Sequence, residues 1–372
     1  KHSTTDPAGP DLRQVRLALD VMGGDHGPSP IIEGGVMAAL EYGAGVHITL
    51  VGDQRQISEG LNRLERRPAN ISVQHAEHEV MMSDSPAEAV RRPNTSVAVG
   101  LKLQKAGEVD AFVSPGNTGA VMAGALLVLG RISGVNRPAI CALFPTRNFR
   151  TRPVLDVGAN TTCKAINILQ FAAMGSAYVS AMYGVKSPRV GLLSIGEERS
   201  KGNELIVQSH KLLEESHLNF AGNVEGRDIL SGDTDVVVTD GFTGNILLKF
   251  AESIAPFLTA RIRHQVSTNI FSRIGAGLMS PFLGRLRRAF DYAESGGAPL
   301  LGIDGAVYIC HGSSSPRAVK NALGLTKQMV EKKTVQKIRE VMKNSDILRV
   351  SSEARTQAAT REPEASMETS HG

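Results

Sequence analysis

The sequence is poor in the residues that carry several common functions. Tryptophan is absent and aromatic residues make up only 4% of the 372 residues. No nucleic-acid-binding motif is present either, so we expect no nucleic-acid partner. The three cysteines, Cys141, Cys163 and Cys310, lie far apart inside apolar runs. They form neither a metal quartet nor a disulfide framework, which favours a reducing compartment and a cytoplasmic protein.

The motifs of several enzyme classes are missing as well. The chain has no Gly-Lys pair, hence no Walker A loop, and no Gly-x-Gly-x-x-Gly follows a predicted strand. It also has no Gly-x-Ser-x-Gly elbow and no His-Glu-x-x-His helix. These absences remove support from covalent and zinc mechanisms, and we expect neither a metal nor a cofactor.

What the sequence has instead is a set of Gly/Asn loops between apolar runs and helical patterns. Backbone N–H groups can converge on a ligand at glycine, and the following helix N-terminus adds about half a positive charge. One such loop is more often an ordinary turn, but three favour an anion site, with phosphate as the first candidate. The loops are Ser114-Pro115-Gly116-Asn117-Thr118-Gly119, Asp156-Val157-Gly158-Ala159-Asn160 and Asp240-Gly241-Phe242-Thr243-Gly244-Asn245.

Short apolar runs alternate with helical patterns, which predicts a mostly parallel sheet covered on both faces, a three-layer α/β/α sandwich. Ligands collect beyond the carboxyl ends of such strands, so we expect the loops along one rim. We assign a polar tail to 1–14, one catalytic domain to 15–346 and a disordered tail to 347–372. Strands are expected at 15–22, 47–52, 71–74, 109–113, 139–144, 153–157, 190–195, 235–239 and 306–310. Helices are expected after Ser29, with Pro30 first, after the Ser85 capping box, after Asn117, and at 162–182 and 203–215.

Polar side chains gather at the same strand ends. Cys310 could be a nucleophile, but a small core residue is the commoner role for a cysteine that ends an apolar strand. His26 and His311 both follow strands beside glycines, where proton transfer and a structural hydrogen bond are about equally supported. The candidate ligand-binding residues are Asp25, Ser114, Gly116, Asn117, Thr118, Gly119, Asn160, Lys164, Asn203, Asp240, Thr243, Gly244 and Ser313.

Seven blocks of sequence carry a more specific signal: Leu19-Asp20-Val21-Met22-Gly23-Gly24-Asp25-His26, Ser114-Pro115-Gly116-Asn117-Thr118-Gly119, Asp156-Val157-Gly158-Ala159-Asn160, Ser194-Ile195-Gly196-Glu197-Glu198 with Lys201-Gly202-Asn203-Glu204, Gly222-Asn223-Val224-Glu225-Gly226, Asp240-Gly241-Phe242-Thr243-Gly244-Asn245 and Gly296-Gly297-Ala298-Pro299-Leu300-Leu301-Gly302. In this order, over about 15–323, they resemble the PlsX family of bacterial phosphate acyltransferases of phospholipid synthesis.

The resemblance implies the fold of phosphotransacetylases and, more remotely, of isopropylmalate and isocitrate dehydrogenases. It implies that acyl-[acyl-carrier-protein] and orthophosphate give acyl phosphate and free carrier protein. It also implies a homodimer, peripheral membrane association and a downstream glycerol-3-phosphate acyltransferase. The chain departs from the family at three places: Arg92-Pro93-Asn94-Thr95-Ser96-Val97 replaces a Lys-Lys-Asp-Ser-Ser-Met block, Thr162 replaces an acid, and Ser295 replaces a tyrosine.

The residues suit this reaction on physical grounds. Orthophosphate is largely doubly ionised near neutral pH, and a thiol with a pKa near ~8.5 leaves readily, so positioning and charge stabilisation suffice. We expect the Gly/Asn loops, with Lys201 and Asn245, to hold phosphate in line with the thioester carbonyl. His26 or His311 would protonate the departing thiolate.

The segment 253–290 contains no acidic residue but has six arginines among apolar residues. A core or subunit-interface helix with a solvated arginine face explains this pattern about as well as a protruding helical arm, 253–292, whose apolar tip enters anionic lipid. The same arginines also suit an acidic carrier protein. The candidate contacts are Arg273, Leu278, Met279, Phe282, Leu283, Arg285, Arg287 and Arg288.

Two other functions fit parts of this pattern. A phosphotransacetylase-like enzyme that uses acyl-CoA would share the chemistry but not the carrier. A non-catalytic phosphate or nucleotide binder docked on a membrane would share the loops and the arm. Release of free thiol that depends on orthophosphate separates the enzymes from the binder.

Overall fold

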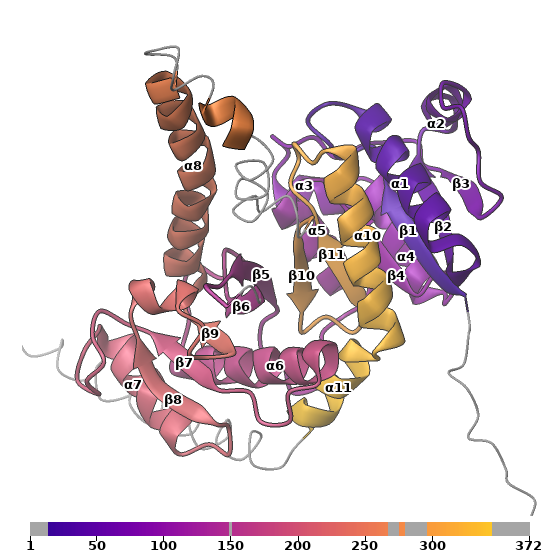
Figure 1. The fold of residues 1–372 in the computed structure, drawn as a ribbon. Coiled ribbons are helices and arrows are strands. Elements are labelled where there is room, and N and C mark those ends of the chain that lie inside the picture. The colour runs from indigo at the N-terminus through magenta and orange to yellow at the C-terminus, as the bar shows by residue number, and fades with distance from the viewer. Residues whose placement is uncertain (1–13, 149–150, 267–274, 280–295, 344–372) are drawn as a thin grey trace, which may run out of the picture.

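The computed structural model describes residues 14–148, 151–266, 275–279 and 296–343, which build a sheet of eleven strands (Figure 1). The strand order is β3-β2-β1-β4-β11-β10-β5-β6-β9-β7-β8. The strands are β1 (Val15–Asp20), β2 (Val46–Gly52), β3 (Ile71–His75), β4 (Ala111–Ser114), β5 (Ala139–Pro145), β6 (Thr151–Leu155), β7 (Val190–Leu193), β8 (Phe220–Val224), β9 (Val236–Val238), β10 (Ala298–Leu301) and β11 (Ala306–Ile309).

Helices cover both faces of the sheet, which confirms the predicted three-layer sandwich. On one face, Leu17 and Leu155 join a core cluster with α1 (Pro28–Tyr42), α2 (Gln54–Asn62), α6 (Ala165–Tyr183), α7 (Glu204–Glu214), α10 (Pro316–Glu331) and α11 (Thr334–Met342). On the other face, Phe112 and Val154 pack with α4 (Ser96–Lys105), α5 (Thr118–Val128) and the start of α8 (Gly241–Val266). The short α3 (Pro86–Arg91) lies against α5, and the 3-10 turns are η1 (Gly43–Gly45) and η2 (Gly226–Leu230).

The sheet consists of two parallel blocks that run in opposite directions. The first block is β3, β2, β1, β4 and β11, and the second is β6, β9, β7 and β8. Between them, β10 is antiparallel to β11 and to β5, and β5 is antiparallel to β6. The carboxyl ends of the two blocks therefore point in opposite directions, but they meet at the centre of the sheet, because Ile309 at the end of β11 pairs with Ala298 of β10 and Leu155 at the end of β6 pairs with Cys141 of β5. The expectation of one rim of parallel strands is wrong in this respect, although the Gly/Asn loops still converge.

The nine predicted strands all occur, with ends within two residues of the prediction. Two further strands, β8 and β10, were not predicted, because Gly222, with φ +96°, and Pro299 are residues that normally interrupt strands. The predicted start of the first helix is also wrong. α1 begins at Pro28 after Gly27, with φ +73°, and not after Ser29, because Pro28 itself suits a first helical position.

One described helix, α6, is long and apolar enough to cross a membrane by length and composition alone. Its most apolar window is 83% buried inside the fold, where Phe171 and Tyr178 are fully enclosed. This burial is what the central helix of a packed core shows.

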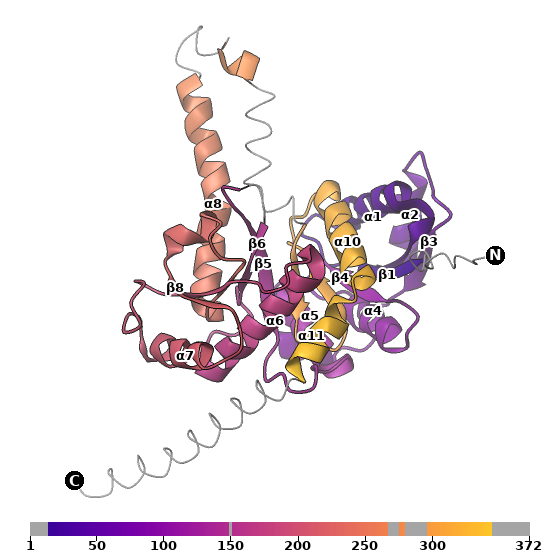
Figure 2. The same ribbon diagram turned by 60° about the horizontal axis from the view of Figure 1, so that its bottom comes forward.

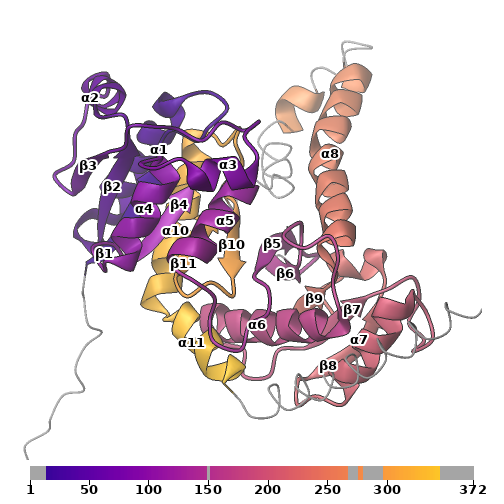
Figure 3. The same cartoon turned by 180° about the vertical axis from the view of Figure 1, so that it is seen from behind.

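Helix α8 begins beside the sheet and then projects beyond both helix layers (Figures 1 and 2). Figure 3 shows the same from behind, with the first turns of α8 near β5, β6 and β9. Its exposed apolar side chains include Phe242, Ile246, Phe250 and Phe257, and Leu278 is 77% exposed in the helical segment 275–279. The predicted protruding arm is thus confirmed over the described residues.

Several predicted residues and segments lie outside the part of the chain that the structure describes. They are the tail residues 1–13 and 347–372, and the arm residues Arg273, Phe282, Leu283, Arg285, Arg287 and Arg288.

Candidate active site

A cleft of about 330 Å³ lies where the sheet reverses direction. Ile140 of β5 and Ala298 of β10 form part of its wall, and residues from the ends of both blocks complete it. The loops at the carboxyl ends of the two opposed blocks therefore open onto one space. The lining residues are Met82, Gly116, Thr118, Ile140, Val157, Gly158, Asn245, Leu248, Lys249, Glu252, Gly297, Ala298, Ile309, Cys310, His311 and Gly312.

The rim of the first block is organised by Asp20, a fully buried carboxylate at the end of β1. Its Oδ1 accepts a hydrogen bond from the Met22 N–H at 3.0 Å, and its Oδ2 accepts one from Ser114 Oγ at 2.7 Å. Ser114 Oγ in turn accepts from the Gly116 N–H at 3.1 Å. A Cβ on Gly23 would lie only 2.5 Å from the Gly116 Cα. The loops after β1 and β4 are therefore locked together, with Gly116 and Thr118 facing the cleft.

His311 lies in this rim, directly after β11. The Ser313 N–H donates to His311 Nδ1 at 3.1 Å, and the Ser313 hydroxyl lies 2.8 Å from the same nitrogen. Because a backbone N–H can only donate, Nδ1 is the acceptor and the neutral ring carries its proton on Nε2. His311 can therefore present an N–H donor to a ligand in the cleft.

The rim of the second block is organised by Asp156, which follows β6. Its carboxylate accepts hydrogen bonds from the N–H groups of Ile140, Gly158, Ala159 and Asn160 at 2.7 to 3.2 Å, and from Asn160 Nδ2 at 2.9 Å. Burial nevertheless raises the pKa of Asp156. Asn160 Nδ2 also donates to the Pro138 carbonyl at 2.7 Å. These loop donors, predicted to face phosphate, are engaged by a carboxylate of the protein itself.

The start of α8 packs directly on the Asp156 loop. A Cβ on Gly244 would lie 1.9 Å from the Asp156 carbonyl oxygen, and one on Gly241 would lie 2.6 Å from the Asn160 carbonyl oxygen. Asp240 caps the helix, since its carboxylate accepts from the Thr243 N–H at 2.9 Å and from the Thr243 hydroxyl at 2.7 Å. Glycine is required at 244 because backbone fills the space that a side chain would need.

One turn further on, α8 supplies the polar wall of the cleft. Asn245, Leu248, Lys249 and Glu252 all line it, and Lys249 Nζ lies 2.9 Å from Glu252 Oε2. Sequence reasoning found Asn245 but missed the other three, as well as Met82. The signal was present, because positions 245, 248, 249 and 252 follow the i, i+3, i+4, i+7 spacing of one helix face.

Cys310 also lines the cleft, but its thiol is poorly suited to act as a nucleophile. It is buried, and burial raises its pKa to about 12. The thiolate that nucleophilic attack requires is therefore scarce at neutral pH. This supports the prediction that Cys310 is a small residue of the core. Within the described ranges, His, Cys, Asp and Glu side chains form no group of three that could hold a metal ion.

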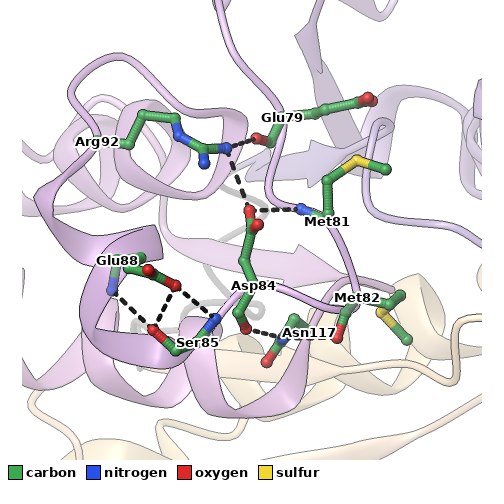
Figure 4. Close-up of polar contacts among 8 residues, drawn as sticks. All are labelled: Glu79, Met81, Met82, Asp84, Ser85, Glu88, Arg92 and Asn117. Atoms are coloured by element: carbon green, nitrogen blue, oxygen red, sulfur yellow. Dashed lines mark hydrogen bonds and ion pairs between the residues drawn. The ribbon is translucent and has the colours of Figure 1, made fainter.

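Asn117 is the N-cap of α5 and holds a neighbouring segment in place. Its Oδ1 accepts from the Ala120 N–H at 3.1 Å, while its Nδ2 donates to the carbonyls of Met82 at 3.1 Å and Asp84 at 2.9 Å. Figure 4 shows this amide beneath the segment that carries Met82 and Asp84. Its donors are thus engaged within the protein, beside the cleft.

The remaining predicted residues lie elsewhere on the rims. Of the predicted set, Gly116, Thr118, Asn245 and His311 line the cleft, whereas the others do not. Asn203 is the N-cap of α7, and Lys164 precedes α6. His26, Asp25, Lys201 and Ser313 are exposed, and a Cβ on Gly312 would lie 2.6 Å from the Asp25 carboxylate. A direct role for these residues stays a prediction.

Comparison with known proteins agrees with this architecture. The model of a family described as fatty acid synthesis protein matches residues 15–337. A phosphate acyltransferase of Desulforamulus reducens is 46% identical over 331 residues, which covers 89% of this chain and 98% of that protein. A phosphate acyltransferase of Myxococcus xanthus is 48% identical over 321 residues, which covers 85% of this chain and 90% of that protein.

Solved structures show the same fold at low sequence identity. The EutD phosphotransacetylase from Staphylococcus aureus superposes with a TM-score of 0.55 at 18% identity, covering 86% of this chain and 94% of its own. A phosphotransacetylase from Streptococcus pyogenes gives a TM-score of 0.57 at 13% identity, covering 85% and 94%. The matched family model and the identity to curated relatives establish that this chain belongs to the fatty acid synthesis protein family, the PlsX family of phosphate acyltransferases that its sequence resembles.

Proposed function

We propose that this protein transfers the acyl group of an acyl-[acyl-carrier-protein] to orthophosphate in the cleft where the two blocks meet. A phosphate oxygen attacks the thioester carbonyl carbon, the C–S bond breaks, and acyl phosphate and free carrier protein leave. The observation that carries this proposal is the lining of the cleft. It combines an anion-attracting helix N-terminus, an N–H donor and an ammonium group with a buried cysteine, and burial raises the pKa of that thiol.

We assign the phosphate to the first rim. Thr118 opens α5, so the positive end of that helix dipole points toward the cleft. Lys249 faces the same space from α8 and is the cation that we assign to the phosphate. Its pairing with Glu252 is a surface ion pair, worth little enough to yield to a doubly charged ligand. Lys201, the cation that the sequence suggested, does not line the cleft.

We assign proton transfer to His311. Its Nε2–H would donate to the departing thiolate, while Ser313 holds Nδ1 and so fixes the tautomer. Asn245 would support the oxyanion that develops on the thioester carbonyl, a contribution of about 3 kcal/mol per donor in other enzymes. Asn117 and Asn160 would act as positioning residues, because their donors already bind protein oxygens.

The direct test is trapping of the product. Purified protein is incubated with palmitoyl-[acyl-carrier-protein] and labelled orthophosphate, and acyl phosphate is captured with hydroxylamine. We expect hydroxamate and free thiol in equal amounts, both dependent on phosphate. Palmitoyl-CoA in parallel distinguishes the carrier, and the carrier protein should be the better substrate. Thiol release without phosphate, or an acylated protein seen by intact mass spectrometry, would refute direct attack.

We further propose that the arm brings the enzyme to anionic membrane or to a second copy of itself. Arg261 and Arg263 supply positive charge near the end of α8, and the exposed Leu278 and Met279 supply apolar surface. Flotation with anionic vesicles should recover the wild-type protein, and Leu278→Asp should reduce recovery. Equal recovery of both proteins would refute lipid insertion. Sedimentation of the wild-type protein tests whether it forms a dimer. The downstream glycerol-3-phosphate acyltransferase stays a prediction from the resemblance.

A further inference from the structure

A second cavity, of about 160 Å³, lies between α3, α4 and α5. Apart from Arg92, Thr95 and Lys102, it is lined by apolar residues and one glycine. The lining residues are Val80, Ala89, Val90, Arg92, Pro93, Thr95, Val97, Ala98, Lys102, Ala120, Gly124, Leu127 and Val128. Neither the family assignment nor the roles proposed above use this cavity.

Of the three polar side chains on the wall of this cavity, Arg92 and Thr95 have hydrogen-bond partners and Lys102 is exposed to solvent. Arg92 Nη1 donates to Asp84 Oδ2 and to the Glu79 carbonyl, each at 3.1 Å, as Figure 4 shows. Thr95 Oγ1 accepts from the Ala98 N–H at 3.1 Å and so caps α4. A ligand rich in amides or hydroxyls would leave its own polar groups unpaired among the apolar side chains, which is costly. A hydrocarbon chain has no polar groups that would be left without hydrogen bonds.

Two separate segments join this cavity to the catalytic cleft. Val80 lines the cavity and Met82 lines the cleft, and two residues of extended chain span at most about 7 Å. On α5, Thr118 lines the cleft and Ala120 lines the cavity. The segment 79–93, which we call the strap, is therefore the boundary between the two spaces.

The strap packs on α5 through α3, is tied by hydrogen bonds at Asn117 and Arg92, and carries adaptable side chains. Asn117 Nδ2 holds the carbonyls of Met82 and Asp84, and Arg92 ties Asp84 to Glu79 (Figure 4). Met81 and Met82 are about half exposed, and unbranched thioether side chains adjust readily to an irregular apolar partner. A hydrocarbon chain that lies across them would remove this surface from water.

We propose that the cavity receives the distal end of the acyl chain of the substrate, which extends from the cleft past Met82. This inference rests on the proposed function, because it takes the acyl group to be bound in the cleft. The cavity then sets chain-length preference: kcat/KM rises about fourfold for each added methylene that enters it, and levels off once it is full.

The test fills the cavity from one wall. Ala98 is half-buried on α4 and lines the cavity, whereas Ala123 is half-buried on α5 and does not. We compare Ala98→Leu with the matched control Ala123→Leu, using octanoyl, dodecanoyl and palmitoyl thioesters of the carrier protein. Ala98→Leu should lower kcat/KM about tenfold for palmitoyl and less than twofold for octanoyl, while Ala123→Leu changes neither. An equal change at all chain lengths in Ala98→Leu, including no change, would overturn the inference.

A binding measurement separates this inference from the proposed function. Wild-type protein that releases no thiol from any thioester refutes the function, but the cavity can still be probed with a fluorescent anthroyloxy-palmitate. Ala98→Leu should weaken binding of this probe about tenfold, and Ala123→Leu should not. Equal affinity of wild type and Ala98→Leu would overturn the cavity assignment whatever the activity shows.

Discussion

The tripeptide Leu-Asp-Val occurs at the carboxyl ends of two strands, as Leu19-Asp20-Val21 at β1 and Leu155-Asp156-Val157 at β6. The two aspartates organise the loops that follow differently. Asp156 gathers the N–H groups of its own loop around its carboxylate. Asp20 accepts from the Met22 N–H of its own loop and also binds the Ser114 hydroxyl on the neighbouring strand. The second loop is closed around an internal anion, and the first forms a wall of the cleft. A Gly/Asn loop thus indicates an anion, which can be a side chain of the same protein.

The largest expected effect comes from removing the charge of the two aspartates in turn. Asp156→Asn places an NH₂ group against N–H donors that cannot rotate away, so we expect a loss of about 4 kcal/mol in the free energy of unfolding at pH 7. Asp20→Asn should cost only about 1 kcal/mol, because its NH₂ group can donate to the Ser114 hydroxyl, which also accepts. Urea denaturation measures both. Equal losses of unfolding free energy in the two variants would show that the two aspartates stabilise their loops to the same extent.

The close packing on the second loop gives the next effect. Gly244→Ala forces a methyl group into the Asp156 carbonyl oxygen, and backbone on both sides cannot repack, so we expect a loss of about 3 kcal/mol. Gly226→Ala is the control, since a Cβ there meets no atom within 4 Å, and it should change stability by less than about 0.5 kcal/mol. Thermal unfolding compares them. A Gly244→Ala protein as stable as the control would show that the Asp156 loop can move to make room for the methyl group.

Activity should depend on the open rim of the first block. His311→Gln removes the proposed proton donor and should lower kcat about 100-fold, with KM for phosphate nearly unchanged. His26→Gln, exposed and outside the cleft lining, should keep kcat within about twofold. Initial rates of thiol release measure both variants. The reverse ranking would move proton transfer to His26.

The smallest effect is a pH dependence of stability. Burial raises the pKa of Asp20 above its ordinary value of 3.8, so the folded protein binds this proton more tightly than the unfolded chain. The contribution of Asp20 to the free energy of unfolding is fully present below its pKa in the unfolded chain, and it is lost as pH rises through its pKa in the folded protein. The advantage of wild type over Asp20→Asn should therefore shrink from pH 4 to pH 7. An advantage that grows with pH would show that hydrogen bonding outweighs burial.

The sequence predicted the layers well, because nine of the strands are short apolar runs and several of the following helices carry their own start signal. Asn117 and Asn203 are the N-caps that their positions suggested, and the Ser85 capping box is present. The reversal of the sheet was not predicted, although a signal existed. β5 ends at Pro145 and β6 begins at Thr151, and this connection is too short for the crossover that parallel neighbours need.

The site was predicted only where it lies next to a strand end. Gly116, Thr118 and His311 follow β4 and β11 directly, so local pattern was sufficient. Lys249 reaches the cleft because a long helix passes it, and that depends on where α8 packs. The local sequence also did not predict the direction in which the N–H groups of the Gly/Asn loops point. Nothing in a Gly-Ala-Asn sequence says whether its N–H groups face solvent or a carboxylate four residues earlier.

The strand order has a consequence for synthesis on the ribosome. β4 has its second neighbour in β11, and about 190 residues, including the whole second block, lie between them in the chain. At typical rates of elongation, one edge of β4 waits roughly 10 to 40 s for its partner to emerge. Such an edge is a template for wrong pairing. During synthesis, one edge of β4 is therefore unpaired for this period, although β4 lies inside the sheet of the finished protein.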